Sequence, residues 1–316
     1  MARRILIVKT TSMGDVIHAL PSVTDIATVI PDAEIDWVVE SSFADIVRLS
    51  THVKNVHEVS VRRWRKNLFS ASMWREVSAV KKTLRDAHYD LVIDLQGLVK
   101  SAVIGRWCRS TLAGYDAKSI KEPLASRFYD QTYAVSRGDS AVNRCRQLCA
   151  KALTYEWESL PLDFGLKTQT LHGSQQPYVV FLVNTSRETK LWREERWVAL
   201  GQDCVQQGYE VRFLWGAPLE EERVKRIADG IGQAATVCPR MSIAECARVL
   251  GDAQYVIGVD TGLTHLAAAL DRPTVGLFLD FPIELVGLTG RCVKSIGGVG
   301  ADLSVEAVNA ALSEML

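Results

Sequence analysis

The 316-residue chain lacks any imbalance of charge, since Lys plus Arg and Asp plus Glu each number 37. A neutral chain has no global field that draws it to nucleic acid or to a membrane, so electrostatic recognition must come from local clusters. No apolar stretch approaches the length of a membrane span, and the N-terminal apolar run stops at Lys9, too early for a signal peptide. We therefore expect a cytoplasmic protein without a nucleic-acid partner.

Cysteine motifs and metal motifs are also missing. The seven cysteines are odd in number and form no C-x-x-C pair. Their scatter through apparent helices and strands indicates buried free thiols in a reducing compartment. No His or Cys pair has the spacing of metal ligands and no Asp-x-Asp occurs, so the sequence predicts no metal site.

Two nucleotide-binding fingerprints are absent as well. No G-x-G-x-x-G follows a strand pattern, which disfavours an NAD enzyme, and no G-x-x-x-x-G-K-[ST] is present, which argues against a P-loop NTPase. Any phosphate would therefore be held by other groups.

The chain is rich in short apolar runs that alternate with helical patterns. Alternation at this spacing predicts parallel sheets covered on both faces, the α/β class. The segment 159–177 lacks periodicity and indicates a connection, so we expect two Rossmann-like domains, 1–160 and 175–316. An amphipathic stretch at 304–316 predicts a last helix whose docking site the sequence does not reveal. The expected strands lie at residues 5–8, 35–39, 91–93, 178–183, 211–215, 255–259 and 274–278.

A turn at residues 9–15 leads from the first strand pattern into a helix pattern, and Asp15 stands at its end. Apolar residues recur at helical spacing from Val16 to Ile30, which puts Asp15 at the helix opening. The free N–H groups there favour an ionised side chain. Asp15 is thus a candidate base or electrostatic partner, although an Asp that merely caps the helix gives the same pattern.

A phosphate site is predicted in the second half. Thr261 and Gly262 follow the strand pattern 255–259 and open a helix, whose N–H groups suit a pyrophosphate. His265 lies in the first turns of that helix, where its imidazole is a candidate partner for a phosphate oxygen. A histidine that is merely packed or solvated on the helix is an equally good interpretation. The loop 184–190 is dense in donors and carries Lys190 as a point charge.

The loop 216–223 follows another strand pattern and contains three acids. One of them is a candidate partner for a ribose diol, while acids that complement a helix N-terminus are the alternative.

Residues 61–69 pack four cations and two aromatic residues into an otherwise neutral chain. Clustered guanidinium groups suit phosphate recognition, and Trp64 with Phe69 is expected in a headgroup layer. An anionic amphiphile is therefore favoured over nucleic acid, with a solvated loop as the alternative. Lys100 follows a different strand pattern and points to the same ligand edge.

Taken in order, these segments resemble the bacterial lipopolysaccharide heptosyltransferases over nearly the whole chain. The resemblance implies a GT-B glycosyltransferase that moves L-glycero-D-manno-heptose from ADP-heptose to the inner Kdo of Kdo-modified lipid A. It also implies an inverting, metal-independent reaction without a cofactor, at the cytoplasmic face of the inner membrane with peripheral association. The segments that carry the resemblance are residues 5–18, 62–66, 94–101, 122–126, 215–223 and 259–265.

The resemblance also implies roles for single residues. Asp15 would be the general base, Glu220 would hold the ribose, Met241 would line the adenine pocket and Asp260 would contact the heptose. The phosphates and the rest of the donor would be bound by Thr185, Ser186, Lys190, Thr261, Gly262 and His265. The anionic groups of the acceptor would be bound by Arg62, Arg63, Lys66 and Lys100.

Two departures from the family pattern stand out. The Thr-Thr pair of the family is Thr185-Ser186 here, which keeps both hydroxyls. Residues 278–282 read Phe-Leu-Asp-Phe-Pro where relatives have a loop like Gly-Pro-Thr-Asp-Pro, so no contact is predicted from this loop.

Three alternatives stay open from the sequence. The first is heptosyltransferase II, which acts later in the core; residues 62–66 and 97–101 favour the enzyme that adds the first heptose. The second is a nucleotide-sugar epimerase of similar fold, against which the basic, aromatic segment argues. The third is a non-catalytic sensor of sugar nucleotides.

Overall fold

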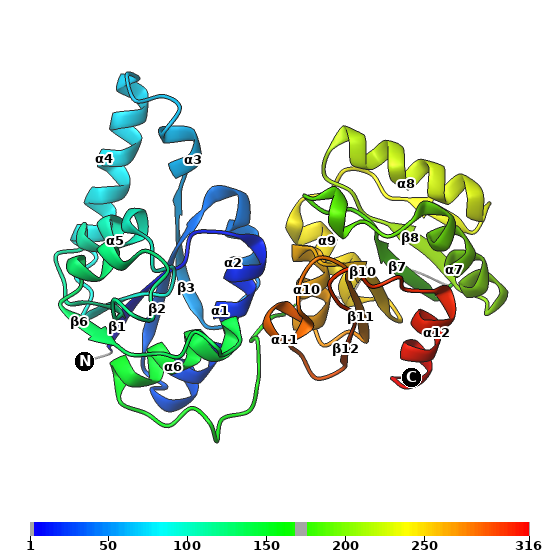
Figure 1. The fold of residues 1–316 in the computed structure, drawn as a ribbon. Coiled ribbons are helices and arrows are strands. Elements are labelled where there is room, and N and C mark those ends of the chain that lie inside the picture. Colours follow the sequence, from blue (N-terminus) through cyan, green and yellow to red (C-terminus); the bar gives the residue numbers. More distant parts are fainter. Residues whose placement is uncertain (1–2, 168–175, 316) are drawn as a thin grey trace. The chain divides into compact units, whose positions relative to one another are not determined.

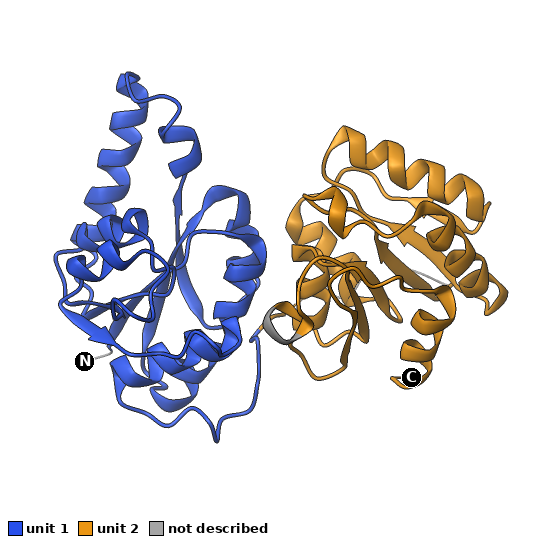
Figure 2. Cartoon of the chain, in the orientation of Figure 1, with its two compact units in different colours: residues 1–165 blue, residues 166–316 orange. Residues whose placement is uncertain are grey.

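The computed structural model describes residues 3–167 and 176–315. The chain divides into two compact units, Met1–Gly165 and Leu166–Leu316 (Figure 2). Each unit is built on a six-stranded sheet whose paired strands are parallel, so the predicted α/β class is confirmed. The division falls inside the expected connection 159–177, of which residues 168–175 lie outside the described part of the chain.

Unit 1 has the strand order β3-β2-β1-β4-β5-β6. Its strands are β1 (Arg4–Val8), β2 (Glu34–Glu40), β3 (Val53–Val59), β4 (Leu91–Asp94), β5 (Leu112–Tyr115) and β6 (Gln131–Tyr133). Its α-helices are α1 (Met13–Val29), α2 (Ala44–Arg48), α3 (Val61–Trp64), α4 (Ala71–Asp86), α5 (Val99–Arg106) and α6 (Ala141–Leu153), with 3-10 turns η1 (Ser41–Phe43) and η2 (Pro123–Phe128).

Unit 2 has the strand order β12-β11-β10-β7-β8-β9. Its strands are β7 (Tyr178–Leu182), β8 (Glu210–Phe213), β9 (Ala235–Val237), β10 (Val256–Val259), β11 (Thr274–Phe278) and β12 (Val293–Gly297). Its helices are η3 (Glu188–Lys190), α7 (Glu194–Gln206), α8 (Pro218–Ile231), α9 (Ile243–Gly251), α10 (Gly262–Ala269), α11 (Ile283–Val286) and α12 (Val305–Ser313).

Both sheets have the strand order of dinucleotide-binding folds, in which the direction of winding reverses at the centre. The reversal lies between β1 and β4 in unit 1. In unit 2 it lies between β7 and β10, which are both labelled in Figure 1. Loops that leave the carboxyl ends of these strand pairs diverge to opposite faces and leave a crevice, where such folds bind their ligands. The sheet order of each unit therefore defines one expected binding crevice.

The central strands form because their residues are apolar without interruption. Ile5 to Val8 of β1 are fully buried, as is Val179 to Phe181 of β7, which is the pattern of a strand covered on both faces. The last helix docks on unit 2, where α12 packs against α7 and β11 and buries Val308 and Leu312 in the core. Among the described residues, no helix is long and apolar enough to cross a membrane.

The cysteines are free thiols, as expected, and six of the seven are buried. Cys292 is the exception, because it is only partly buried just before β12.

Candidate functional site

Asp15 occupies the third position of α1, after the N-terminal cap residue Ser12. Its Oδ2 accepts hydrogen bonds from the Ser12 backbone N–H at 2.9 Å and from the Ser12 hydroxyl at 3.1 Å. The side chain is half-buried. Asp15 therefore does cap α1. The cap uses one oxygen of its carboxylate and fixes the orientation of the side chain.

A buried lysine lies close to this carboxylate. Lys9 is 7% exposed, and its ammonium donates to the Leu95 carbonyl at 2.9 Å. Burial alone would raise the pKa of Asp15, but the charge of Lys9, the Ser12 amide and His18 outweigh it, so the pKa is lowered. Asp15 is thus held as a carboxylate at neutral pH. Lys9 is not among the residues expected from the sequence, although its place in the same turn was a signal.

Gln96 links the two loops at the crevice of unit 1. Its Oε1 accepts hydrogen bonds from the backbone N–H groups of Thr10 and Thr11, both at 2.9 Å. Lys100, a predicted acceptor residue, reaches the same place, since its ammonium lies 3.4 Å from the Thr11 hydroxyl. The crevice of unit 1 therefore brings Asp15, Lys9 and Lys100 to the carboxyl ends of β1 and β4.

The second loop is itself anchored by a buried carboxyl group. Asp94 at the end of β4 is fully buried and accepts hydrogen bonds from the Ser101 and Tyr129 hydroxyls, each at 2.8 Å. The backbone N–H groups of Gln96 and Gly97 also bond to it. This arrangement fixes the start of the loop that carries Gln96 and Lys100.

In unit 2, the structure joins four predicted donor residues. The Lys190 ammonium lies 2.5 Å from Asp260 Oδ2, and His265 Nε2 lies 3.5 Å from Asp260 Oδ1. The Thr185 hydroxyl donates to the Asp260 carbonyl at 3.0 Å. Lys190 and Thr185 come from the loop after β7 and Asp260 and His265 from β10 and α10, so these contacts bridge the crevice of unit 2.

Asp260 is charged in this arrangement. Burial would raise the pKa of its carboxyl, but the hydrogen bond from His265 and the adjacent Lys190 lower it below its usual range. An ionised acid beside a lysine partly neutralises that lysine, so a bound anion and Asp260 would compete for the Lys190 ammonium.

A pocket of about 270 Å³ opens beside this cluster. Thr185, Ser186 and Glu220 line it. Glu220 also closes the start of α8, because its Oε2 accepts from the backbone N–H groups of Gly216 at 2.8 Å and Ala217 at 3.1 Å. The helix-capping interpretation of this acid is therefore correct, and one oxygen is committed to it.

The remaining predicted donor residues lie on the neighbouring loops of unit 2. Thr261 is the cap residue of α10 and Gly262 its first residue, so both stand at the N-terminus of the helix beside Asp260. Met241 is half-buried and directly precedes Ser242, the cap residue of α9. No contact links Met241 to the Lys190 cluster in the described interactions.

The loop that departs from the family pattern packs onto the cluster. Phe281 lies under two cations, with the Lys190 ammonium 4.9 Å and the Arg187 guanidinium 5.4 Å from the ring centre. Arg187 also lies 3.6 Å from Asp280. The sequence analysis predicted no contact from this loop, and only the fold brings the end of β11 against the loop after β7.

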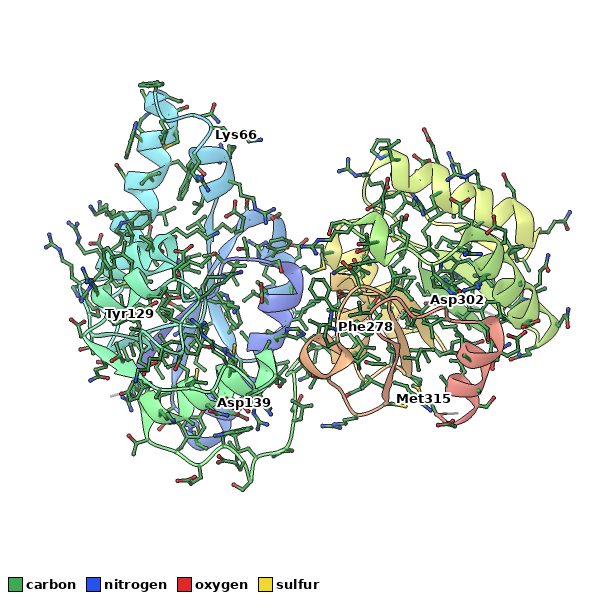
Figure 3. The ribbon with its side chains drawn as sticks, viewed as in Figure 1. Lys66, Tyr129, Asp139, Phe278, Asp302 and Met315 are labelled. Carbon is green, nitrogen blue, oxygen red and sulfur yellow. The ribbon has the colours of Figure 1, made fainter. Side chains whose placement is uncertain are left out.

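The basic segment of unit 1 differs from the sequence prediction in one respect. Trp64 is 6% exposed, so its expected place in a headgroup layer is wrong. The short helix α3 turns Trp64 inward, whereas Phe69 is fully exposed. The Nη2 group of Arg63 donates to both carboxylate oxygens of Glu76 in α4, at 2.6 and 2.8 Å. Lys66 is exposed in the turn that follows α3 (Figure 3).

Within residues 3–167 and 176–315, no group of three or more His, Cys, Asp or Glu side chains is arranged to hold a metal ion. Metal-independent chemistry stays a prediction.

Comparisons with known proteins identify the family of the chain. A family model described as glycosyltransferase family 9 (heptosyltransferase) matches residues 77–297. Lipopolysaccharide heptosyltransferase 1 of Pseudomonas aeruginosa is 46% identical over 93% of this chain and 83% of its own length.

Two solved structures are also similar. The structure of E. coli heptosyltransferase WaaC with ADP has a TM-score of 0.93 and 40% identity, covering 99% of this chain and 100% of that chain. The same enzyme with ADP-2-deoxy-2-fluoro heptose has a TM-score of 0.89 and 39% identity, covering 98% and 99%. The family expected from the sequence is confirmed, and with it an enzyme of the glycosyltransferase class: the chain belongs to glycosyltransferase family 9, the heptosyltransferases.

Proposed function

We propose that this enzyme transfers L-glycero-D-manno-heptose from ADP-heptose to the inner Kdo of Kdo-modified lipid A, with inversion at the anomeric carbon and without a metal ion. The observation that carries the proposal is the cluster of Lys190, Asp260 and Thr185 at the crevice of unit 2. A lysine, hydroxyls and a helix N-terminus together suit a diphosphate. Similar E. coli enzymes hold ADP or an ADP-heptose analogue.

The proposed chemistry needs charge at two places. The Asp15 carboxylate takes the proton of the acceptor hydroxyl as its oxygen bonds to the anomeric carbon, while the bond from that carbon to the diphosphate oxygen breaks and ADP leaves. Lys190 and the N-terminus of α10 stabilise the negative charge on the leaving diphosphate. The lowered pKa of Asp15 makes it a weaker base but keeps it ionised, so it also stabilises the cationic sugar directly.

Acceptor binding is assigned to unit 1. Lys100 lies in the first turn of α5, which follows the end of β4. Arg62, Arg63 and Lys66 follow the end of β3, at the same edge of the sheet. Exposed cations at this edge suit the anionic groups of Kdo and lipid A phosphates. Peripheral association with the cytoplasmic face of the inner membrane follows from the chemistry of such an acceptor.

The direct test is incubation of the purified enzyme with ADP-heptose and Kdo-modified lipid A, followed by mass spectrometry of the lipid and NMR of the new linkage. The proposal predicts a lipid heavier by one heptose with inverted anomeric configuration. Transfer only to acceptors already carrying heptose would assign the enzyme to a later step, and release of a modified sugar without a lipid product would indicate an epimerase.

A further inference from the structure

Three large apolar side chains stand exposed at one point of unit 1. Phe69 is fully exposed, and Leu68 and Trp74 are each 54% exposed. We call these three residues the apolar tip. They fall within seven positions of the chain, at the junction of α3 and α4 that stands out from the rest of unit 1 (Figure 1). Elsewhere in the described residues, the exposed large apolar side chains are dispersed: Val103, Leu124, Leu219 and Val299.

The tip is held in place by polar contacts. The Trp74 indole N–H donates to the Leu68 carbonyl at 2.8 Å, and the Ser70 hydroxyl caps α4 by accepting from the Met73 N–H at 3.4 Å. The pair of Arg63 and Glu76 joins α3 to α4 below it. These polar contacts fix the turn in a conformation that keeps the three apolar side chains exposed.

The segment that carries the tip is rich in positive charge, and the acid that follows it, Glu76, is paired with Arg63. Residues 61–75 contain five cations and no acid in a chain whose overall charge is zero. Arg62, Arg65, Lys66 and Arg75 are exposed. Exposed cations close in the chain to exposed aliphatic and aromatic groups are complementary to an anionic lipid surface, where the apolar groups enter the interface and the cations contact phosphates. The phosphates of a nucleic acid would bind the cations, but nucleic-acid binding would give the exposed Leu68 and Phe69 no role.

We propose that the apolar tip inserts into the interface of an anionic bilayer and that the surrounding cations bind its lipid phosphates. The proposal rests on the proposed function, since it gives the enzyme a way to hold its acceptor edge at the membrane that contains the acceptor. It assigns the membrane contact to Leu68, Phe69 and Trp74, and not to the buried Trp64.

The first test is sedimentation with vesicles of phosphatidylcholine alone or mixed with phosphatidylglycerol. We expect wild-type protein to bind the mixed vesicles, with weaker binding at high salt. The double variant Leu68→Ser/Phe69→Ser should bind these vesicles at least about tenfold more weakly than the wild type. Val299→Ser removes another exposed apolar group, in unit 2, and should bind as the wild type does. Equal binding of the double variant and the wild type would overturn the proposal.

A second measurement separates the tip from the catalytic function. The double variant should keep its kcat/KM on an acceptor stripped of its acyl chains, and lose activity on the same acceptor embedded in anionic vesicles. Loss on both acceptors would place the residues in substrate binding and overturn the proposal. If the wild type transfers no heptose to either acceptor, the proposed function fails, while the sedimentation result still decides the membrane contact.

Self-association is the competing use of such a surface. Analytical ultracentrifugation without lipid should show the same mass for the wild type and the double variant. A wild-type dimer that the double variant abolishes would make the tip an interface between copies and overturn the proposal.

Discussion

The Lys190 ammonium lies 2.5 Å from the Asp260 carboxylate, across the crevice between the loops after β7 and β10. The pair holds the lysine where a donor diphosphate is expected and leaves its charge partly compensated until an anion binds. In the proposed function, the donor diphosphate would replace Asp260 as the partner of Lys190.

Replacement of Lys190 should weaken donor binding above all. Lys190→Ala removes a charged hydrogen bond, worth about 1.5–3 kcal/mol, and leaves the Asp260 carboxylate without its lysine, so ADP affinity should fall about 10- to 150-fold. Calorimetric titration with ADP measures this. Lys225→Ala, which removes an exposed lysine paired with Glu221, is the matched control and should bind ADP normally. Unchanged affinity of Lys190→Ala would remove this lysine from the donor site.

Phe281 should support donor binding through its contact with Lys190. A cation–π contact is worth about 0.5–2 kcal/mol, so Phe281→Leu should raise the KM for ADP-heptose about 2- to 30-fold with little change in kcat. Phe281→Tyr keeps the ring and should restore the wild-type KM. A fall in kcat at constant KM, or failure of Tyr to rescue, would contradict this role.

Lys9→Met should change the pH dependence of the reaction. The Lys9 charge helps to lower the pKa of Asp15, so its loss raises that pKa, and a higher pH is needed to keep the carboxylate ionised. The acid limb of kcat/KM should therefore move to higher pH, while the rate on the plateau changes less. An acid limb that stays in place, or moves to lower pH, would contradict the electrostatic link between these residues.

Arg146→Met should destabilise unit 1. Arg146 and Asp25 form a buried pair with contacts of 2.7 and 2.9 Å, and Arg146 also donates to the Leu160 carbonyl at 3.0 Å. Loss of one partner of a buried pair costs about 3–5 kcal/mol. Chemical denaturation should show this loss, whereas Arg106→Met, which breaks the more exposed pair with Asp130, should cost no more than about 1 kcal/mol. Equal losses of unfolding free energy in the two variants would show that burial of the ion pair does not determine how much its removal destabilises the protein.

The sequence predicted the interior strands well, with the exception of β5, and missed the four edge strands of the two sheets. The strands β1, β4, β7, β10 and β11 each contain an uninterrupted apolar run because both of their faces are covered. The strands β3, β6, β9 and β12 lie at sheet edges, where His57 and Lys294 alternate with apolar residues and no continuous apolar run arises. The interior strand β5 was also missed, since its four residues include Gly114.

The candidate site divides in the same way. Asp15 and Lys190 were singled out because each lies in a turn or loop that follows a strand pattern, and a parallel sheet gathers such loops at one edge. Asp260 was named only through the family resemblance. Phe281 was missed because its contact with Lys190 depends on which loops the fold brings together. Trp64 was misplaced because α3 is a single turn of four residues, too short for periodicity to show which side faces inward.

The most direct test of the account is a single-turnover experiment with Asp15→Asn, ADP-heptose and Kdo-modified lipid A. An Asn side chain can still accept the Ser12 hydrogen bonds, so the fold and ADP affinity should be preserved. The account predicts that transfer slows by roughly a hundredfold or more, because the proton acceptor and the negative charge beside the sugar are both lost. Near-normal transfer by this variant would contradict the account.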